Sequence, residues 1–222
     1  MKLFIDTANI NEIRQVKSWG ILSGVTMNPV LVSKEGRPFK ELAIEICKMF
    51  PSDAFISLEV AAMDAEGMVK QARKLANWSP NVVVKIPAID EGLKALSVLT
   101  QEKIKTNFTI VFSASQAVLA ALAGATFVSP FLGRLKAEGG NSFELLSDIV
   151  SVFKTHNVST QVLAASIKTQ NDVIEAFKAG SDVVTAPFRV LQEMIQHPLT
   201  GTDLKTFMDA WGKVPDANEV FK

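Results

Sequence analysis

A lysine at position 85 stands in an unusual place for a charged side chain. It lies within the stretch NVVVKIPA (residues 81–88), after three valines and before Ile86 and Pro87. Such a run indicates a central strand covered on both faces, where burying an ammonium group is costly. Burial lowers the pKa of a lysine and favours the neutral amine, which is the nucleophile of Schiff-base chemistry on a carbonyl substrate. A lysine on an edge strand, or one that snorkels to the surface, is the alternative interpretation.

Polar side chains also end or follow most of the other short apolar runs. Asn107 and Thr109 are two residues apart, so they point to the same face of one strand. Carboxylates, amides and cations at strand ends could supply a lysine nucleophile with acid–base partners and with a site for an anion. The residues of this set are Asp6, Asn28, Glu59, Asn107, Thr109, Ser129, Arg134, Ser166 and Lys168.

Several of these residues have an ordinary structural interpretation when each is taken alone. Asp6 could cap a following helix, and the pair Asn28-Pro29 is a common start of a turn. Glu59 could pair with a neighbouring lysine, while Arg134 and Lys168 could be surface charges. These polar residues come from seven consecutive predicted strands. If all of them meet at one end of a sheet, a role in stability alone is a poor explanation for their presence there.

The elements that would bring them together are predicted by an alternation of short apolar runs and longer amphipathic ones. Each short run has about five to seven residues and is rich in Val, Ile, Thr or Phe, as parallel strands are. The predicted strands are 2–6, 22–26, 54–60, 81–86, 105–110, 125–129, 160–166 and 181–186. Helical spacing is clearest in 9–20, 65–78, 114–124 and 174–180, the last two ending on Gly124 and Gly180 as helix caps.

Eight strand–helix units without a linker favour an α/β fold of the (β/α)8 TIM barrel type. The alternative is a doubly wound open sheet, but no Gly-x-Gly-x-x-Gly follows any predicted strand. Active sites in the barrel lie at the C-terminal ends of the strands, where the polar set would converge. Residues 1–222 are therefore predicted to form a single barrel domain.

The end of the chain predicts one further helix, at about 201–212. It would carry an apolar stripe of Leu204, Phe207, Met208 and Trp211. Eight helices already cover a barrel, so this stripe could pack on a neighbouring subunit. Packing across the bottom of its own barrel is an equally open alternative.

Composition excludes some classes of partner and compartment. The 23 basic and 23 acidic residues cancel, and no block of like charge suggests binding to nucleic acid or to a membrane surface. Cys47 is the only cysteine and lies in an apolar helical stripe, which predicts a core position and fits a reducing compartment. His156 and His197 are far apart, so no metal site is predicted. With no signal-like segment at the N-terminus, we expect a cytoplasmic protein.

The same polar residues lie in motifs that resemble the small transaldolases, a family that includes the fructose-6-phosphate aldolases. The motifs occur in family order and cover nearly the whole chain. They are FIDTANI (4–10), GVTMNP (24–29), VVVKIPA (82–88), KTNFTIVFSASQA (105–117), ATFVSPFLGR (125–134), VLAASIK (162–168) and VVTAPF (183–188).

The resemblance implies a class I aldolase-like barrel in which Lys85 is the Schiff-base lysine. Asp6 would handle the proton of the sugar hydroxyl, and Glu59 with Thr109 and a water would shuttle protons at the imine. Asn28 and Asn107 would hold substrate hydroxyls. The substrate phosphate would contact Arg134, Ser166 and Lys168.

The reaction implied is transfer of a dihydroxyacetone unit between sugar phosphates, with no metal or organic cofactor. The family commonly forms homo-pentamers or homo-decamers in which the C-terminal helix reaches a neighbour. Phe131, Glu59 and Ser129 favour a transaldolase, because the aldolases of the family carry tyrosine, glutamine and alanine there. The alternatives are a fructose-6-phosphate aldolase and a non-catalytic barrel that binds sugar phosphates. Met27 departs from the common threonine and could narrow the mouth of the site.

Overall fold

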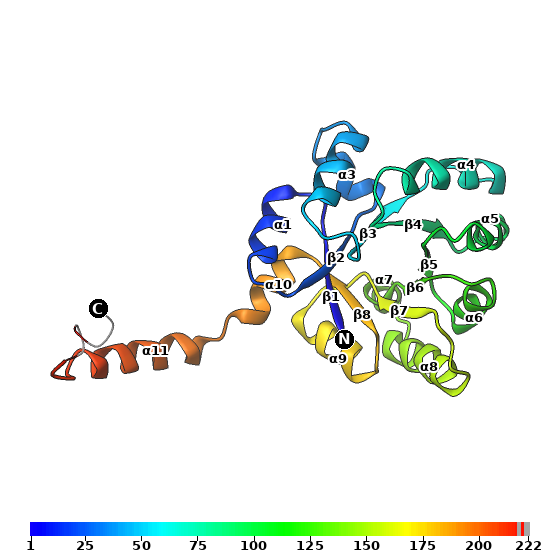
Figure 1. Cartoon of the computed structure of the whole chain (residues 1–222). Coiled ribbons are helices and arrows are strands. Elements are labelled where there is room, and N and C mark those ends of the chain that lie inside the picture. The colour runs from blue at the N-terminus through cyan, green and yellow to red at the C-terminus, as the bar shows by residue number, and fades with distance from the viewer. Residues whose placement is uncertain (217–218, 220–222) are drawn as a thin grey trace.

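Eight parallel strands close into a barrel in chain order in the computed structural model, which describes residues 1–216 and 219 (Figure 1). Each of the eight predicted runs overlaps one of these strands, so the (β/α)8 barrel is confirmed and the open sheet is wrong. The strands are β1 (Lys2–Asp6), β2 (Leu22–Thr26), β3 (Phe55–Glu59), β4 (Val82–Pro87), β5 (Thr106–Val111), β6 (Phe127–Pro130), β7 (Gln161–Ala164) and β8 (Val183–Ala186).

Helices follow every strand and surround the barrel (Figure 1). They are α1 (Ile10–Lys17), α2 (Pro29–Lys34), α3 (Phe39–Lys48), α4 (Ala65–Ala76), α5 (Asp90–Gln101), α6 (Ala114–Leu122), α7 (Leu132–Ala137), α8 (Ser142–Thr155), α9 (Gln170–Lys178), α10 (Phe188–Ile195) and α11 (Pro198–Trp211). Gly124 and Gly180 follow α6 and α9 at φ values of 85° and 91°, so the predicted glycine caps are confirmed.

Strand side chains alternate between two cores. Those that point outward, such as Ile5, Val84 and Val184, pack against the helices in the larger hydrophobic cluster. Cys47 is buried in that cluster, as predicted, and burial raises the pKa of its thiol to about 11. Both faces of the strands are therefore covered, which explains why the strand sequences are nearly continuously apolar.

The lower interior of the barrel is filled by an aromatic cluster. Phe4, Phe55 and Phe127 contact one another with ring centroids 5.0 to 6.2 Å apart. Gly24 on β2 leaves room for them, since a Cβ there would lie 3.0 Å from the Phe4 ring and 2.2 Å from the Phe55 carbonyl oxygen. This aromatic cluster closes the barrel from below. The next inward-facing residues on β1 and β6, two positions further along each strand, are the polar Asp6 and Ser129.

The last helix, α11, extends away from the barrel (Figure 1). No residue between 198 and 211 is buried, so the alternative in which this helix packs on its own barrel is wrong. Its predicted start at about 201 is also wrong, because Pro198 occupies the first turn, where proline fits, and the His197 side chain accepts a hydrogen bond from Leu199 N–H. Along the described part of the chain, no helix combines the length and apolar character needed to cross a membrane.

Candidate active site

A cavity of about 680 Å³ opens at the C-terminal ends of the strands. All eleven residues that the sequence singled out for chemistry or binding line this cavity. The structure places together Asp6, Asn28, Glu59, Lys85, Asn107, Thr109, Ser129, Phe131, Arg134, Ser166 and Lys168. Their convergence follows from the parallel barrel, which brings the same end of every strand to one mouth.

Lys85 projects into the barrel from β4 and is only 4% exposed. Its Nζ lies 3.0 Å from Glu59 Oε2 and donates a hydrogen bond to the Met27 carbonyl oxygen at 3.1 Å. Glu59 and Lys85 are paired in the register of β3 and β4, so the two side chains emerge side by side. The predicted burial of the amine is confirmed, and the lysine that the sequence suggested as a partner for Glu59 is Lys85. Glu59 Oε2 is placed to accept a proton from Lys85 Nζ when the amine attacks a carbonyl group.

Asp6 ends β1 and faces the same interior. The N-cap of α1 is Asn9, whose side chain accepts hydrogen bonds from Asn11 N–H and Glu12 N–H, so Asp6 has no capping role. Its Oδ1 accepts a hydrogen bond of 2.7 Å from the Thr26 hydroxyl. Burial raises the pKa of the Asp6 carboxyl above its ordinary value, although the Thr26 hydrogen bond and the Lys85 charge act in the opposite direction. A carboxyl with a raised pKa is suited to accept and return a proton near neutral pH.

A buried polar row continues from Lys85 across β5 and β6. Asn107 pairs with Lys85 in the register, and its Oδ1 accepts a hydrogen bond of 2.5 Å from Ser129 Oγ. Asn107 Nδ2 lies 3.4 Å from Ser57 Oγ, so the amide orientation is set from both sides. Thr109 Oγ1 is buried and has no hydrogen-bond partner among the residues that the structure describes. A buried hydroxyl usually has a partner, so this one is available to a group in the cavity.

Two cations stand at the rim of the cavity. Arg134 on α7 and Lys168 after β7 are both exposed, and Arg134 forms a surface ion pair of 2.9 Å with Glu138. Ser166 lies between them in the left-handed backbone region at φ 59°, and its carbonyl oxygen accepts a hydrogen bond of 3.1 Å from Gly133 N–H. This bond joins the first turn of α7, which carries Arg134, to the loop that carries Lys168. Two cations and a hydroxyl at one mouth form a site for a multiply charged anion.

The backbone of Lys168 is fixed on both sides. Its N–H donates to Asp172 Oδ2 at 3.1 Å, and its carbonyl oxygen accepts from Arg189 Nη2 at 2.9 Å. Burial acts to raise the pKa of Asp172, but hydrogen bonds from the N–H groups of Lys168 and Thr169 outweigh it and hold this pKa below the ordinary value. A carboxylate that stays charged therefore anchors the loop while the lysine side chain is free to reach into the cavity.

Two further predicted residues have structural contacts of their own. Asn28 caps α2 through a hydrogen bond from Leu31 N–H to Oδ1, which leaves its Nδ2 to donate into the cavity. The turn interpretation of the Asn28-Pro29 pair is therefore wrong, because this pair begins a helix. Phe131 packs edge-on against Phe112, with ring centroids 6.0 Å apart, and forms part of the cavity wall.

Met27 does not narrow the mouth, contrary to the expectation from sequence. Its side chain is buried in the core and does not line the cavity. It lines an adjoining hollow of about 250 Å³, which shares Asn28 and Glu59 with the cavity. The strand ends at Thr26, which points inward, so the next residue points outward. What Met27 presents to Lys85 is its backbone carbonyl.

The sequence interpretation missed two threonines that line the cavity, Thr26 and Thr185. Each is buried and lies near the end of its strand, where the inward-facing position is polar in most of the barrel. Threonine is common in ordinary strands, so its type alone gives no signal. Both residues could have been identified by asking which side chain at the end of each predicted strand points into the barrel.

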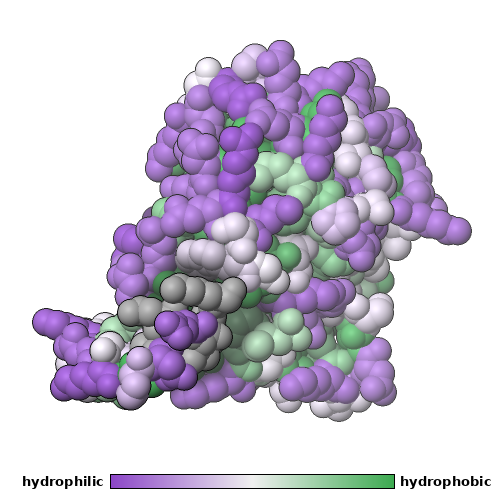
Figure 2. Space-filling view, turned by 60° about the vertical axis from the view of Figure 1, so that its left-hand side comes forward, coloured by the Kyte–Doolittle hydropathy of each residue, from purple (hydrophilic) through white to green (hydrophobic). Residues whose placement is uncertain are grey.

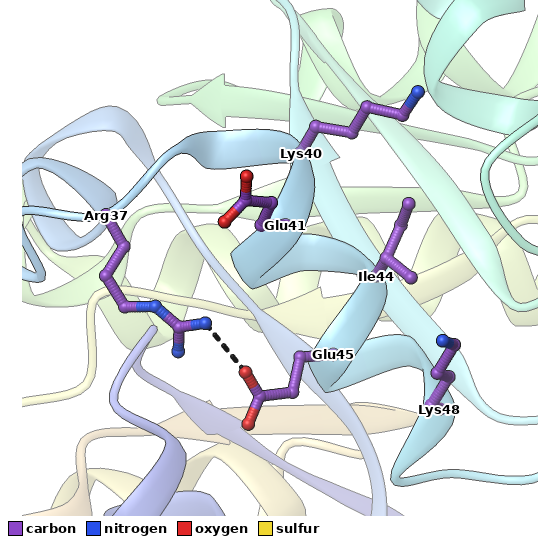
Figure 3. A pocket seen from close by; sticks show the side chains of 6 residues that line it. All are labelled: Arg37, Lys40, Glu41, Ile44, Glu45 and Lys48. Carbon is purple, nitrogen blue, oxygen red and sulfur yellow. Dashed lines mark hydrogen bonds and ion pairs between the residues drawn. The ribbon is translucent and has the colours of Figure 1, made fainter.

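A second hollow lies over α3, with a volume of about 520 Å³ (Figure 3). Its lining is formed by Arg37, Lys40, Glu41, Ile44, Glu45 and Lys48. Arg37 and Glu45 form an ion pair of 2.8 Å, and both side chains are more than a third exposed. Exposed pairs contribute about 0–1 kcal/mol and hold groups loosely. The barrel mouth, with its buried lysine and carboxylates, is therefore the candidate active site.

Comparisons with known proteins agree with this geometry. A family model described as "Transaldolase/Fructose-6-phosphate aldolase" matches residues 3–220. A "Probable transaldolase" of Caldicellulosiruptor saccharolyticus is 55% identical, with 98% of this chain and 100% of that protein covered. A second, of Herpetosiphon aurantiacus, is 51% identical over 100% of this chain and 99% of that protein.

A solved structure of thiamine phosphate pyrophosphorylase from Pyrococcus furiosus superposes with a TM-score of 0.59, covering 87% of this chain and 93% of that chain. The two sequences are 15% identical, so this likeness concerns the fold alone. The family match is different in kind, because it spans nearly the whole chain and is accompanied by relatives more than half identical to it. The chain belongs to the transaldolase/fructose-6-phosphate aldolase family.

Proposed function

We propose that this protein is a transaldolase that transfers a dihydroxyacetone unit through a Schiff base on Lys85. The observation that carries the proposal is the buried Lys85 amine, 3.0 Å from the Glu59 carboxylate, in a cavity with two cations at its rim. A ketose phosphate supplies both a carbonyl for the amine and an anion for the cations. Sedoheptulose 7-phosphate or fructose 6-phosphate would be the donor.

The first step is attack of the Lys85 amine on the ketone carbon of the donor. Glu59 accepts the proton that Nζ loses, and the carbonyl oxygen takes up a proton to give the carbinolamine. Thr109 supports the following loss of water, because its unpartnered hydroxyl can hydrogen-bond to the leaving hydroxyl or to a water that carries the proton. The product is a protonated imine, which withdraws electrons from the adjacent carbon–carbon bond.

Asp6 then removes the proton from the hydroxyl on the carbon beyond the bond that breaks. The O–H electrons form the aldehyde carbonyl, the C–C electrons move to the imine, and an aldose phosphate leaves. A three-carbon enamine stays on Lys85. Attack of this enamine on erythrose 4-phosphate or glyceraldehyde 3-phosphate, with return of the proton from Asp6, forms the new C–C bond. Hydrolysis of the imine releases the product, and the protonated imine serves as the electron sink without a metal or cofactor.

The rim residues support a phosphorylated substrate. Arg134 can bind a phosphate through two N–H groups, while Lys168 and Ser166 contribute charge and a hydroxyl from the neighbouring loop. Asn28 Nδ2 and the Asn107–Ser129 pair would contact the sugar hydroxyls between the phosphate and the lysine. We propose that the enzyme uses such substrates in the pentose phosphate pathway, in the cytoplasm.

Transfer is favoured over simple aldol cleavage by Phe131, which lines the cavity without a hydroxyl. A tyrosine in its place could position water near the imine and promote release of free dihydroxyacetone. Fructose-6-phosphate aldolase activity is therefore the second candidate. A barrel that only binds sugar phosphates is disfavoured, because binding needs neither a buried amine nor the Glu59 carboxylate beside it.

Borohydride trapping tests the Schiff base directly. With fructose 6-phosphate present, we expect reduction to leave one three-carbon adduct on the peptide that contains Lys85, and erythrose 4-phosphate to diminish it by accepting the unit. Peptide mapping by mass spectrometry locates the adduct. Omission of sugar is the control. Absence of an adduct at Lys85 would contradict the proposal, and turnover only with free dihydroxyacetone would favour the aldolase.

The exposed apolar side chains of α11 support assembly into a homo-pentamer or homo-decamer. Leu204, Phe207 and Met208 are 58%, 68% and 60% exposed on a helix that leaves its own barrel. On the face seen in Figure 2, most of the surface is hydrophilic and hydrophobic residues gather in a hollow near the middle. Several exposed apolar side chains on one projecting helix are typical of a subunit contact.

Light scattering of the intact protein is expected to give five or ten times the 24.1 kDa chain mass. The double variant Phe207→Asp/Met208→Asp should shift the mass downward, because two carboxylates would be buried in the contact. Lys205→Asp on the same helix is the matched charge control. A monomeric mass for the unaltered protein would refute the assembly.

A further inference from the structure

A hydrogen-bond chain leads to Asp6 from the strands on either side of it. Thr26 Oγ1 lies 2.7 Å from Asp6 Oδ1 and 2.6 Å from Thr185 Oγ1. β1 pairs with both β2 and β8, so the two threonines approach each other inside the barrel from the strands that flank Asp6. Thr26 and Thr185 are 3% and 2% exposed, so both hydroxyls are largely shielded from bulk water.

Counting protons fixes the direction of the chain. An ionised carboxylate only accepts hydrogen bonds, so the Thr26 hydroxyl must donate its proton to Asp6 Oδ1. Thr26 then has no second proton for Thr185, so the Thr185 hydroxyl is the donor in their contact. The chain therefore runs from Thr185 through Thr26 to Asp6. Its end point, Oδ1, is already occupied as an acceptor.

We propose that Thr26 and Thr185 are positioning residues that orient the Asp6 carboxyl and reserve its other oxygen, Oδ2, for proton transfer with the substrate. The inference rests on the proposed role of Asp6 in carbon–carbon cleavage. When the substrate hydroxyl gives up its proton, the proton goes to Oδ2, and the Thr26 hydrogen bond to Oδ1 is kept throughout. Neither threonine touches the reacting atoms in this scheme, and each acts through Asp6.

The hydrogen-bond chain is one of several influences on the pKa of Asp6. Lys85 and Lys168 favour the carboxylate, while Glu59 and burial favour the protonated acid. The Thr26 hydrogen bond also favours the carboxylate and is the strongest of the influences that lower the pKa of Asp6. Removing it would raise this pKa further and leave less of the base form at neutral pH.

Isosteric valine variants separate the hydroxyls from the packing. In Thr26→Val, we expect the acid limb of the pH profile of kcat/KM to move to higher pH by about one unit, as loss of a hydrogen bond to a charged group implies. Thr185→Val should move it in the same direction by less, because the Thr26 donor remains. Thr26→Ser and Thr185→Ser keep the hydroxyls and should restore the limb.

Thr106→Val is the matched control. The Thr106 hydroxyl is buried on β5 without a hydrogen-bond partner in the described part of the chain. Thr106→Val therefore makes the same change of side-chain shape as Thr26→Val but breaks no hydrogen bond, so the acid limb should stay in place. A second readout is the titration of the Asp6 carboxyl carbon by NMR on the full-length protein, identified by its absence in Asp6→Asn. The titration midpoint should move upward in the same variants.

An Asp6 titration that Thr26→Val leaves unchanged, or that Thr106→Val shifts equally, would overturn the inference even if borohydride traps an adduct on Lys85. The titration does not depend on turnover. Failure to trap Lys85 would overturn the proposed function instead, and the hydrogen-bond chain would still be judged by the titration alone.

Discussion

Replacing Lys85 with methionine is expected to lower turnover by about ten-thousand-fold or more, the scale seen when a covalent nucleophile is removed. Methionine keeps an unbranched chain in the barrel but lacks the amine, so no imine can form and the electron sink of the reaction is lost. Substrate should still bind, because Arg134 and Lys168 at the rim are unchanged. Steady-state transfer assays and phosphate-dependent binding measurements separate these two effects.

The same substitution leaves Glu59 without its cation in a partly buried position. Breaking a buried ion pair by removing one partner destabilises a fold by about 3–5 kcal/mol, whereas replacing both partners by neutral groups costs less. We therefore expect Lys85→Met to lower the melting temperature and Lys85→Met/Glu59→Gln to recover part of it. Neither variant should recover activity.

The exposed Lys70 on α4 offers the control, since Lys70→Met removes an amine that does not line the cavity and should leave turnover unchanged. Turnover of Lys85→Met within tenfold of the unaltered protein would exclude a Schiff base at this position. Another lysine acting as nucleophile would be revealed by an adduct on a different peptide.

The barrel itself was predictable because its strands carry a strong local signal. Each of the eight is short, rich in β-branched and aromatic residues and covered on both faces, so hydrophobic burial and local preference agree. Boundaries shifted by one or two residues where the strand ends turn into loops, as at β7, which ends at Ala164 and not at 166. Ser166 lies in the left-handed backbone region at φ 59°, two residues beyond the end of β7.

The cavity lining was predictable for a related reason. Parallel strands bring their C-terminal ends together, so polar residues at those ends had to converge, whatever each of them does. What the sequence could not show is which neighbours they contact. The ion pair between Lys85 and Glu59 depends on the register of β3 and β4, and the Thr185–Thr26–Asp6 chain depends on closure between β8 and β1.

The last helix shows where local pattern is insufficient. Its apolar stripe predicts a packed helix, but the choice of partner is made by the connection after α10, which directs α11 away from the barrel. The spacing of apolar residues indicates that one face of a helix is buried in a contact. It does not indicate whether that contact is with the same chain or with another subunit.

The two carboxylates of the site show how burial and pairing divide the chemistry. Glu59 Oε2 lies 3.0 Å from Lys85 Nζ, so this carboxyl is placed to exchange protons at the nitrogen that would become the imine. Asp6 is the group whose carboxyl is disfavoured as an ion, since burial outweighs the hydrogen bond from Thr26. Carboxylates in different environments can serve as acid and base at one pH, so we assign cleavage to Asp6 and imine chemistry to Glu59.

Asp6→Asn is consequently expected to change activity and stability in opposite directions. Asparagine cannot take the hydroxyl proton, so transfer should fall by about a hundred- to ten-thousand-fold, the range for loss of a general base. Formation of the imine depends on Lys85 and Glu59, so borohydride should still trap the intact donor sugar on Lys85. An adduct that retains all of the donor carbons would place Asp6 at the cleavage step.

The sign of the stability change follows from the raised pKa of Asp6. The folded state holds the proton more tightly than the unfolded chain, whose aspartate has a pKa of about 3.9, so stability falls as the pH rises between the two values. Above the folded pKa the unfavourable charge is fully present, and neutral asparagine avoids it. The melting temperature of Asp6→Asn should therefore exceed that of the unaltered protein at pH 8, and the difference should shrink as the pH is lowered towards 4. Thermal unfolding across that range tests this directly. A melting-temperature difference that grows on acidification would mean that the folded protein prefers the Asp6 carboxylate. The assignment of Asp6 as a base with a raised pKa would then be wrong.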